Sequence, residues 1–320
     1  MIKSITTFIN RYELIKNNST IIIGLSGGPD SMFLLHFLNI IKTQYNLTLI
    51  AAHLNHEWRI NASDDVEFCA YACQQLNIPF VHAKASELAI TIKKNGSQEA
   101  IGREMRRYFL EQIRKQYNAD AIAVAHHEQD QQETFFIRLI RGATLTGLTS
   151  MRPKSGYYIR PLLQTSKNNI LTYLHNHEIS YLIDPTNISE SYLRNRIRMK
   201  VLPALQEVDP RFDNNFLRTI TSLQETEQFL VELTHQTFNE LSILKNGIYY
   251  LNIEKLLLLH PVMLYHVLMH WLIIQKVSFT PTQGLLDEIQ RFLHQKKSNK
   301  HTINPTWSIH KKHDTTFFLT

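Results

Sequence analysis

Hydroxyls, a carboxylate and two glycines gather near the start of the chain, in Ser26-Gly27-Gly28-Pro29-Asp30-Ser31. An apolar run, 21–23, precedes this segment and apolar residues at helical spacing follow it, so it joins a buried strand to a helix. Such a turn can bind phosphate, because the first N–H groups of a helix are unpaired and glycines let an anion approach the backbone. The residues predict either a phosphate site or a plain capped turn.

Known motifs narrow the chemistry of this turn. A Walker A loop needs G-x-x-x-x-G-K-[ST], and here no lysine follows the glycines. The dinucleotide pattern G-x-G-x-x-G does not occur at this turn. The segment 24–28 does match the G-x-S-x-G elbow of α/β-hydrolases, but few residues precede Ser26, which leaves no room for the strands that come before that elbow. A hydrolase is therefore the weaker interpretation.

The rest of the N-terminal half predicts the frame that positions the turn. Strands and helices are expected in alternation, with further strands at 47–56, 78–85 and 121–127 and helices at 64–76, 96–117 and 129–142. This alternation predicts a doubly wound, mainly parallel α/β sheet with helices on both faces. Ligands bind such sheets beyond the carboxyl ends of the strands. Polar residues fall at these ends, at 26–31, 53–59 and 126–133.

The second half of the chain changes in texture. Short strands are expected at 157–163 and 181–187, and a basic helix at 191–205 that Pro203 interrupts. A smaller, mainly helical domain follows, opening with a long amphipathic linker helix at about 214–242 and ending in a hairpin at 307–320. We expect a catalytic domain at 1–213 and a second domain at 214–320.

Composition limits the classes of protein that are possible. A net charge of +6 with 16 histidines is compatible with a polyanionic partner. The segment 1–20 lacks the features of a signal peptide, and the apolar stretch 256–274 contains histidines and a proline, so it predicts a buried helix rather than a membrane span. We expect a cytoplasmic protein with no membrane partner.

The two cysteines, Cys69 and Cys73, are four residues apart on one helical face. This spacing fits neither a redox pair nor a zinc site, so buried structural thiols are expected.

The turn S-G-G-x-D-S resembles the signature of the PP-loop ATP pyrophosphatases. The resemblance implies that residues 26–31 bind ATP and grip its β and γ phosphates, which leaves the α phosphorus open to attack and makes pyrophosphate the leaving group. Asp30 would then face the phosphates through Mg²⁺. Its alternative role is to cap the helix that begins near Ser31.

Further segments, in order along residues 20–205, resemble the tRNA(Ile) lysidine synthetases, with weaker motifs beyond. The segments are "HLNHEWR" (53–59), "EAIGREMRR" (99–107), "AHHEQDQQETFFIRLIRG" (125–142), "GLTSM" (147–151), "RPLL" (160–163) and "DPTNISESYLRNRIRMKVLP" (184–203). The resemblance implies that ATP adenylates C2 of the wobble cytidine in the CAU anticodon of tRNA(Ile), and that free L-lysine then displaces AMP. A homodimer is compatible with it, and the further C-terminal domain frequent in this family is not expected here.

The resemblance also implies residue roles. Asp130 and Glu133 share a helical face beyond a strand end, where two carboxylates can hold a lysine ammonium and take its proton, or serve only as helix N-terminal acids. Gln129 stands where the family usually has the first of two adjacent acids, so the work of that acid would fall to Glu128 or Asp130. Arg103 is the candidate that neutralises charge on the α phosphate.

Two histidines and a basic set complete the candidates. His53 and His56 would shape the nucleotide pocket, although hydrogen bonding at a strand end is the simpler role for both. Trp58 replaces the usual aliphatic residue, which puts local packing in question. The candidates for tRNA contact, which could equally form a solvated basic face, are Arg59, Arg106, Arg194, Asn195, Arg196 and Arg198.

Two alternatives stay open. A PP-loop tRNA cytidine thiolase would need cysteines placed for an iron–sulfur cluster or a persulfide, and the mid-helix positions of Cys69 and Cys73 do not favour it. A non-catalytic RNA-binding relative would not need the intact S-G-G-x-D-S turn.

Overall fold

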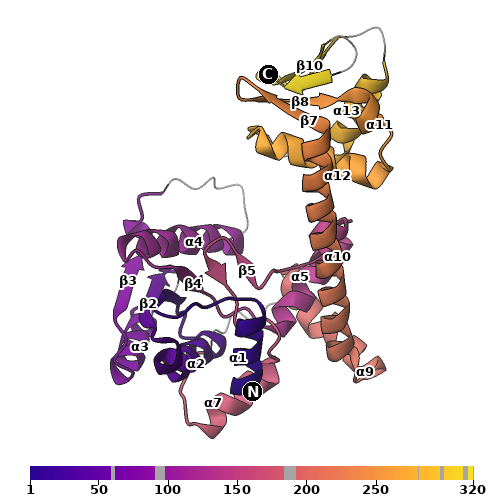
Figure 1. Cartoon of the computed structure of the whole chain (residues 1–320). Coiled ribbons are helices and arrows are strands. Elements are labelled where there is room, and N and C mark those ends of the chain that lie inside the picture. Colours follow the sequence, from indigo (N-terminus) through magenta and orange to yellow (C-terminus); the bar gives the residue numbers. More distant parts are fainter. Residues whose placement is uncertain are drawn as a thin grey trace. The chain divides into compact units, whose positions relative to one another are not determined.

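The computed structural model describes residues 1–58, 62–90, 98–183, 192–279, 281–295, 299–312 and 316–319. The chain forms two compact units, Met1–Ile220 and Thr221–Thr320 (Figure 1). The expected domain border at 213 stands at the start of the long helix α10 (Phe212–Leu241), whereas the division between the units lies inside this helix.

The first unit is built on a six-stranded sheet in the order β3-β2-β1-β4-β6-β5. Its strands are β1 (Thr20–Gly24), β2 (Thr48–Asn55), β3 (Phe80–Lys84), β4 (Ala121–Ala123), β5 (Lys154–Ser155) and β6 (Tyr158–Ile159). The pairings are parallel except between β5 and β6, which confirms the predicted sheet. Because β2 lies on one side of β1 and β4 on the other, the strand order reverses between β1 and β4, where such folds bind their ligands.

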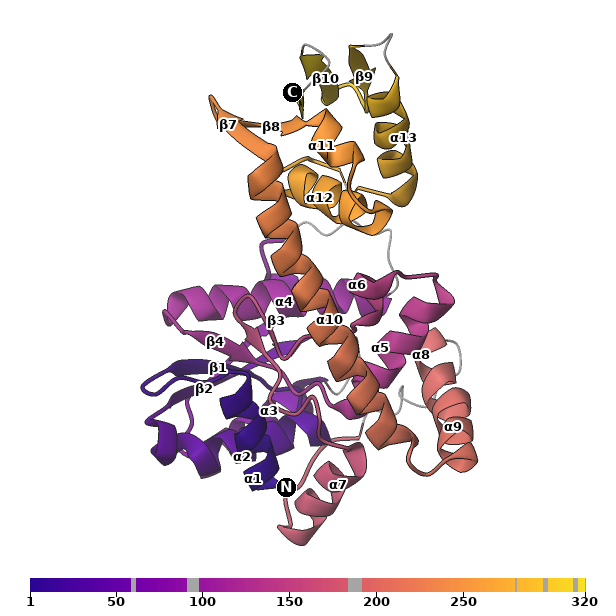
Figure 2. The ribbon, with the colours of Figure 1, turned by 45° about the vertical axis from the view of Figure 1, so that its right-hand side comes forward.

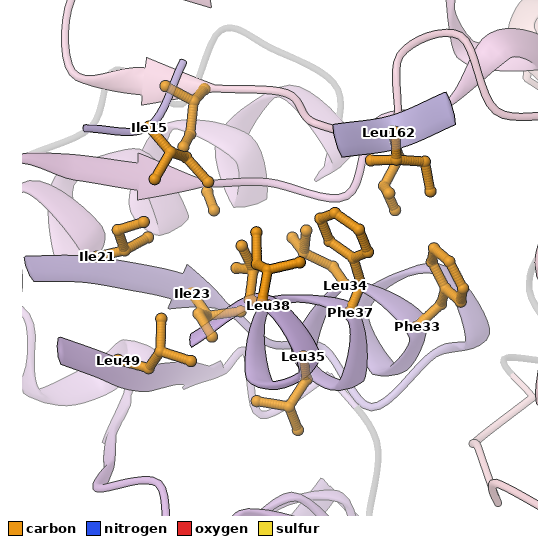
Figure 3. Packing of buried hydrophobic residues seen from close by; sticks show 14 of the residues in the cluster. Ile15, Ile21, Ile23, Phe33, Leu34, Leu35, Phe37, Leu38, Leu49 and Leu162 are labelled. Atoms are coloured by element: carbon orange, nitrogen blue, oxygen red, sulfur yellow. The ribbon is translucent and has the colours of Figure 1, made fainter. Parts of the chain in front are cut away.

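Helices cover both faces of this sheet. They are α1 (Ile2–Arg11), α2 (Pro29–Tyr45), α3 (Ala62–Gln75), α4 (Gln98–Gln116), α5 (Glu128–Ile140), α6 (Leu145–Leu148) and α7 (Lys167–Asn176). Figure 2 shows α4 on one side of the sheet and α1 and α2 on the other. Side chains alternate along a strand, so Ile21 and Ile23 pack with α2 (Figure 3), whereas Ile22 belongs to the cluster on the other face, together with Phe109 of α4. The apolar run of β1 is thus buried on both faces, as a central parallel strand requires.

Two expectations for the later part of this unit are wrong. Residues 181–183 form no strand, and the rest of the strand expected at 181–187 lies outside the described residues. The basic helix does not stop at Pro203: α8 (Leu193–Arg196) continues through a π-helical turn (Ile197–Val201) into α9 (Leu202–Val208). Pro203 stands in the first turn of α9, where the wider π turn before it removes the need for an N–H donor.

The second unit combines helices with a small antiparallel sheet. After α10 come α11 (Ile253–Leu257), α12 (Pro261–Ile274) and α13 (Gln283–His294). The sheet order is β7-β8-β11-β10-β9, with β7 (Ser242–Lys245), β8 (Ile248–Asn252), β9 (Lys300–Thr302), β10 (Ser308–Lys312) and β11 (Thr316–Leu319). The terminal hairpin β10–β11 is confirmed, but it is part of a five-stranded sheet because β8 pairs with β11.

The apolar stretch 256–274 packs inside this unit. Trp271 of α12 is fully buried, and its ring lies 4.8 Å from that of Phe317. None of the described helices combines the length and apolar character that crossing a bilayer requires.

Candidate active site

The Ser26–Ser31 turn leaves β1 at the point where the strand order reverses. The Ser26 N–H donates to Ser31 Oγ (3.1 Å), and Ser31 Oγ donates to the carbonyl oxygen of Gly28 (2.9 Å). Gly28 is the N-cap residue of α2 and Pro29 opens the helix, so no N–H is lost there. The turn is therefore held in shape by its own hydroxyls at a helix N-terminus, which is the arrangement that binds a phosphate.

Gly27 is required by both its conformation and its surroundings. Its φ of +79° lies in the left-handed region. A Cβ on Gly27 would stand 2.7 Å from Leu182 Cδ1 and 3.3 Å from Cys69 Sγ. The Leu182 N–H also donates to the Gly27 carbonyl oxygen (2.9 Å), so the turn is packed and bonded from behind.

The cysteines take the structural role that was predicted for them. Cys69 and Cys73 are buried and free. Burial raises the pKa of each thiol to about 12, so neither is a thiolate near neutral pH.

His53 supports the turn from β2. Its Nδ1 lies 3.0 Å from the carbonyl oxygen of Leu25, the residue before Ser26, and burial lowers the pKa of the imidazole. A neutral ring donating from Nδ1 fits this contact. The strand-end hydrogen bond expected for His53 is thus confirmed.

His56 stacks on Trp58 with ring centroids 4.6 Å apart. Burial, followed by the charge of Arg106, lowers the pKa of His56 to about 4, and an Arg106 guanidinium nitrogen lies 3.4 Å from His56 Nε2. Trp58 packs onto α4 so closely that a Cβ on Gly102 would stand 2.4 Å from its Cη2. The bulky Trp58 is therefore accommodated by Gly102. Arg59, a candidate for tRNA contact, lies outside the described residues.

The N-terminus of α5 places the Asp130 carboxylate near Asp30 of the turn, with His127 between the two acids. Asp130 Oδ2 accepts from the His127 N–H (2.9 Å). His127 Nε2 lies 3.7 Å from Asp30 Oδ2 and 3.6 Å from Asp130 Oδ2, so one buried imidazole links an acid of α2 to an acid of α5. We did not predict a role for His127, although its place directly after a strand was a usable signal.

Asp130 lies close to two imidazoles and a guanidinium group. Burial opposes its ionisation, but His127, His126, Arg194 and the His127 N–H together lower the pKa of Asp130 to about 2. Burial lowers the pKa of the neighbouring His126 to about 4, although the charge of Asp130 acts in the opposite direction. Near neutral pH the site thus holds an ionised Asp130 and a neutral His126.

Glu133 is fully buried between two arginines. Arg198 Nε lies 2.6 Å from Glu133 Oε1, and Arg194 Nε lies 2.7 Å from Glu133 Oε2. The π turn thus brings Arg198 to the same carboxylate as Arg194 of α8. The predicted tRNA-contact residues of this segment therefore differ in their surroundings. Arg194 and Arg198 contact Glu133, whereas Asn195 is buried and Arg196 is exposed to solvent.

Lys167 at the start of α7 is a further residue that we did not predict. Its Nζ lies 2.6 Å and 2.7 Å from the two carboxylate oxygens of Asp30. Its backbone N–H donates to Gln129 Oε1 (2.9 Å), which gives the unusual Gln129 a defined contact. Asp30 does not cap α2, because it lies inside the first turn and its carboxylate bonds to Lys167. The capping alternative is therefore wrong.

Glu128, the first residue of α5, is coupled electrostatically to a polar network around Asp213. The side chain is buried, and burial together with the charge of Asp213 raises the pKa of Glu128 to about 7. Asp213 accepts from Gln132 Nε2 (2.8 Å) and from Gln206 Nε2 (3.0 Å). The network ties α5 to α9 and to the first turn of α10.

A metal at this site would depend on the nucleotide. Within the described ranges no group of three or more His, Cys, Asp or Glu side chains could hold a metal ion. Mg²⁺ is commonly bound by one or two carboxylates together with substrate phosphates. The single carboxylate of Asp30 beside the turn fits that mode. Arg103 is exposed on α4, and its charge contributes to the lowered pKa of His126.

A glycine-containing turn at a helix N-terminus, at the point where a parallel sheet reverses its strand order, is typical of nucleotide-binding α/β proteins. Residues 1–205 match the PP-loop domain family, and the chain belongs to this family.

The chain is similar to curated tRNA(Ile)-lysidine synthases. It is 36% identical over 253 residues to the synthase of Bacillus cereus, covering 75% of this chain and 51% of that protein. It is 31% identical over 315 residues to that of Clostridium acetobutylicum, covering 98% and 62%. The chain thus spans about half to three-fifths of the length of these relatives.

Among solved structures, the U34-tRNA thiolase NcsA from Methanococcus maripaludis, with its [4Fe-4S] cluster, has a TM-score of 0.60 at 21% identity. The match covers 70% of this chain and 78% of that chain. This likeness concerns the fold alone.

Proposed function

We propose that the protein is a tRNA(Ile) lysidine synthetase, which uses ATP to join free L-lysine to C2 of the wobble cytidine in the CAU anticodon of tRNA(Ile). The observation that carries the proposal is the position of His127, which lies within 3.7 Å of both Asp30 and Asp130. The acid proposed to face the ATP phosphates, Asp30, and the acid proposed to hold the lysine amine, Asp130, would thus lie on either side of one imidazole. The names of the similar synthases support the same activity.

In the first step the C2 oxygen of the cytidine attacks the α phosphorus of ATP. The bond between the α phosphorus and its bridging oxygen breaks, and pyrophosphate leaves with that oxygen. The Ser26–Ser31 turn would hold the β and γ phosphates, and Arg103 would offset charge developing on the α phosphate. Asp30 would hold Mg²⁺, which would screen the phosphate charges.

In the second step the ε-amino group of lysine attacks C2, the bond between C2 and the AMP oxygen breaks, and AMP leaves. The ionised Asp130 would attract and orient the lysine ammonium. The ammonium must then lose a proton to solvent, because Asp130, with its pKa lowered to about 2, is too weak a base to keep it. Glu133 already faces two guanidinium groups, so in this arrangement it positions Arg194 and Arg198. Direct binding of lysine by Glu133 stays a prediction.

The RNA would approach over the exposed cations near the site. Arg106 and Arg196 are exposed, and guanidinium groups bind RNA phosphates without reading sequence. The selectivity for tRNA(Ile) would then come from other contacts.

A PP-loop tRNA cytidine thiolase is the second candidate, because the PP-loop domain by itself does not fix which group reacts with the activated cytidine. An iron–sulfur cluster needs cysteine thiolates as ligands. This chain has two cysteines, both buried in α3 with pKa values raised to about 12. Free lysine, rather than a sulfur donor, is therefore the better candidate for the nucleophile that displaces AMP.

The test is incubation with ATP, labelled lysine and a tRNA(Ile) transcript. We expect one AMP for each lysine incorporated, and no incorporation into an elongator methionine transcript with the same anticodon. The Asp30→Ala variant should form no AMP, while Glu67→Ala, at an exposed acid on α3, should retain activity. ADP as the product, or incorporation of sulfur instead of lysine, would refute the proposal.

A further inference from the structure

Lys167 and Asp30 form an ion pair at the mouth of the phosphate-binding turn. The pair joins residues 137 positions apart, and both side chains are partly open to solvent, at 30% and 26%. Asp30 lies in the first turn of α2, directly after Gly28 and Pro29. The Lys167 ammonium is therefore located where the negative charge of bound phosphates would be concentrated.

The backbone of Lys167 is held from two sides, so an exchange of partners would need rotation of the side chain alone. The Lys167 N–H donates to Gln129 Oε1, and the neighbouring Thr165 carbonyl oxygen accepts from the Glu128 N–H (3.1 Å). Ser166 caps α7, and Tyr173 of the same helix packs edge-on against Phe33 of α2 at 5.1 Å. The backbone of this lysine is thus anchored to both α5 and α2.

An isolated Asp30 carboxylate would repel a triphosphate, since like charges at close range disfavour binding. A cation must therefore lie between Asp30 and the phosphates, and Lys167 is the one that the structure pairs with both oxygens.

We propose that Lys167 exchanges partners during nucleotide binding. It neutralises Asp30 in the empty site, and its ammonium moves to the β and γ phosphates when the triphosphate enters and Mg²⁺ takes the carboxylate. This inference rests on the proposed function for the identity of the nucleotide. It makes Lys167 a residue that selects for triphosphate over monophosphate.

The test measures binding rather than turnover, by calorimetry with the full chain, Mg²⁺ and either AMP or an ATP analogue that cannot be cleaved between the α and β phosphates. Lys167→Ala should weaken binding of the analogue about 10- to 100-fold, the range for loss of a charge-assisted bond, and leave AMP binding unchanged. Lys167→Arg should recover part of the loss. Lys16→Ala, at an exposed lysine before β1, is the matched control.

A double-mutant cycle without Mg²⁺ separates this role from a structural clamp between α2 and α7. Asp30→Asn should bind metal-free ATP more tightly than the wild type, because Lys167 is released toward the phosphates. In Asp30→Asn/Lys167→Ala this gain should be lost.

Equal ATP affinity of the single and double variants would overturn the proposal, as would equal weakening of AMP and analogue binding. Analogue binding that follows the expected pattern in a protein that forms no lysidine would refute only the proposed function.

Discussion

The buried Glu128 makes unit 1 sensitive to pH in a direction that the structure fixes. Its side chain is 4% exposed, and burial with the charge of Asp213 raises its pKa from 4.5 to about 7. A carboxyl group whose pKa is raised by folding contributes its full stability below the unfolded pKa and loses it as the pH rises through the folded pKa. The loss runs from pH 4.5 to about 7 and amounts to about 3 kcal/mol, at about 1.4 kcal/mol for each pH unit between the two pKa values.

Glu128→Gln removes the ionisable group and keeps the shape of the side chain. The variant should therefore gain about 3 kcal/mol of unfolding free energy over the wild type at about pH 8, and little at about pH 4. Asp213→Asn should reduce the pH dependence in part, because Asp213 is the second cause of the raised pKa.

The two cysteines allow unit 1 to be followed by itself. Cys69 and Cys73 are buried there and are the two cysteines of the chain, so their exposure to dithiodipyridine at increasing urea reports unfolding of this unit. Glu67→Gln, at an exposed acid, should leave the pH dependence unchanged. If Glu128→Gln shows the same pH dependence as the wild type, the assignment of the raised pKa is refuted.

Further predictions concern the turn and its acids. Gly27→Ala should lower ATP affinity in a direct titration, because its φ of +79° and the 2.7 Å approach to Leu182 both oppose a side chain; binding equal to wild type would contradict this. Glu133→Ala should lower the unfolding free energy by about 3 kcal/mol in the thiol assay, the lower end for a buried pair that loses one partner, with Glu133→Gln less affected. Asp130, with its pKa lowered from 3.8 to about 2, should contribute stability above pH 3.8 that is lost as the pH falls toward 2. Asp130→Asn should therefore lose less unfolding free energy than the wild type over this pH range. The same loss in both proteins would contradict the prediction.

Much of the first unit could be predicted from local patterns. The run 21–23 and the glycines after it predicted a central strand and a phosphate-binding turn, because burial on both faces and a left-handed glycine each leave a mark in neighbouring residues. The terminal hairpin was predicted from the alternation of apolar and polar residues at 307–320. Its pairing with β8 was not, since strands distant in sequence leave no periodic signal of their partner.

The candidate site was predicted only in part. Asp30 was predicted from the S-G-G-x-D-S motif, and Asp130 and Glu133 from their place beyond a strand end and their resemblance to the acidic pair of the family, but the partners of these acids were not predicted. His127 could have been noticed from its position after β4, whereas Lys167 stands in a polar segment without a recognisable signal.

By itself the sequence determined the order of strands and helices, the turn after β1 and the burial of the cysteines, because each depends on residues close together along the chain. Only the tertiary structure decided which charges meet. The Lys167–Asp30 pair, the bridge of His127 and the two arginines on Glu133 join separate elements, and an ion pair depends on distances that only packing sets.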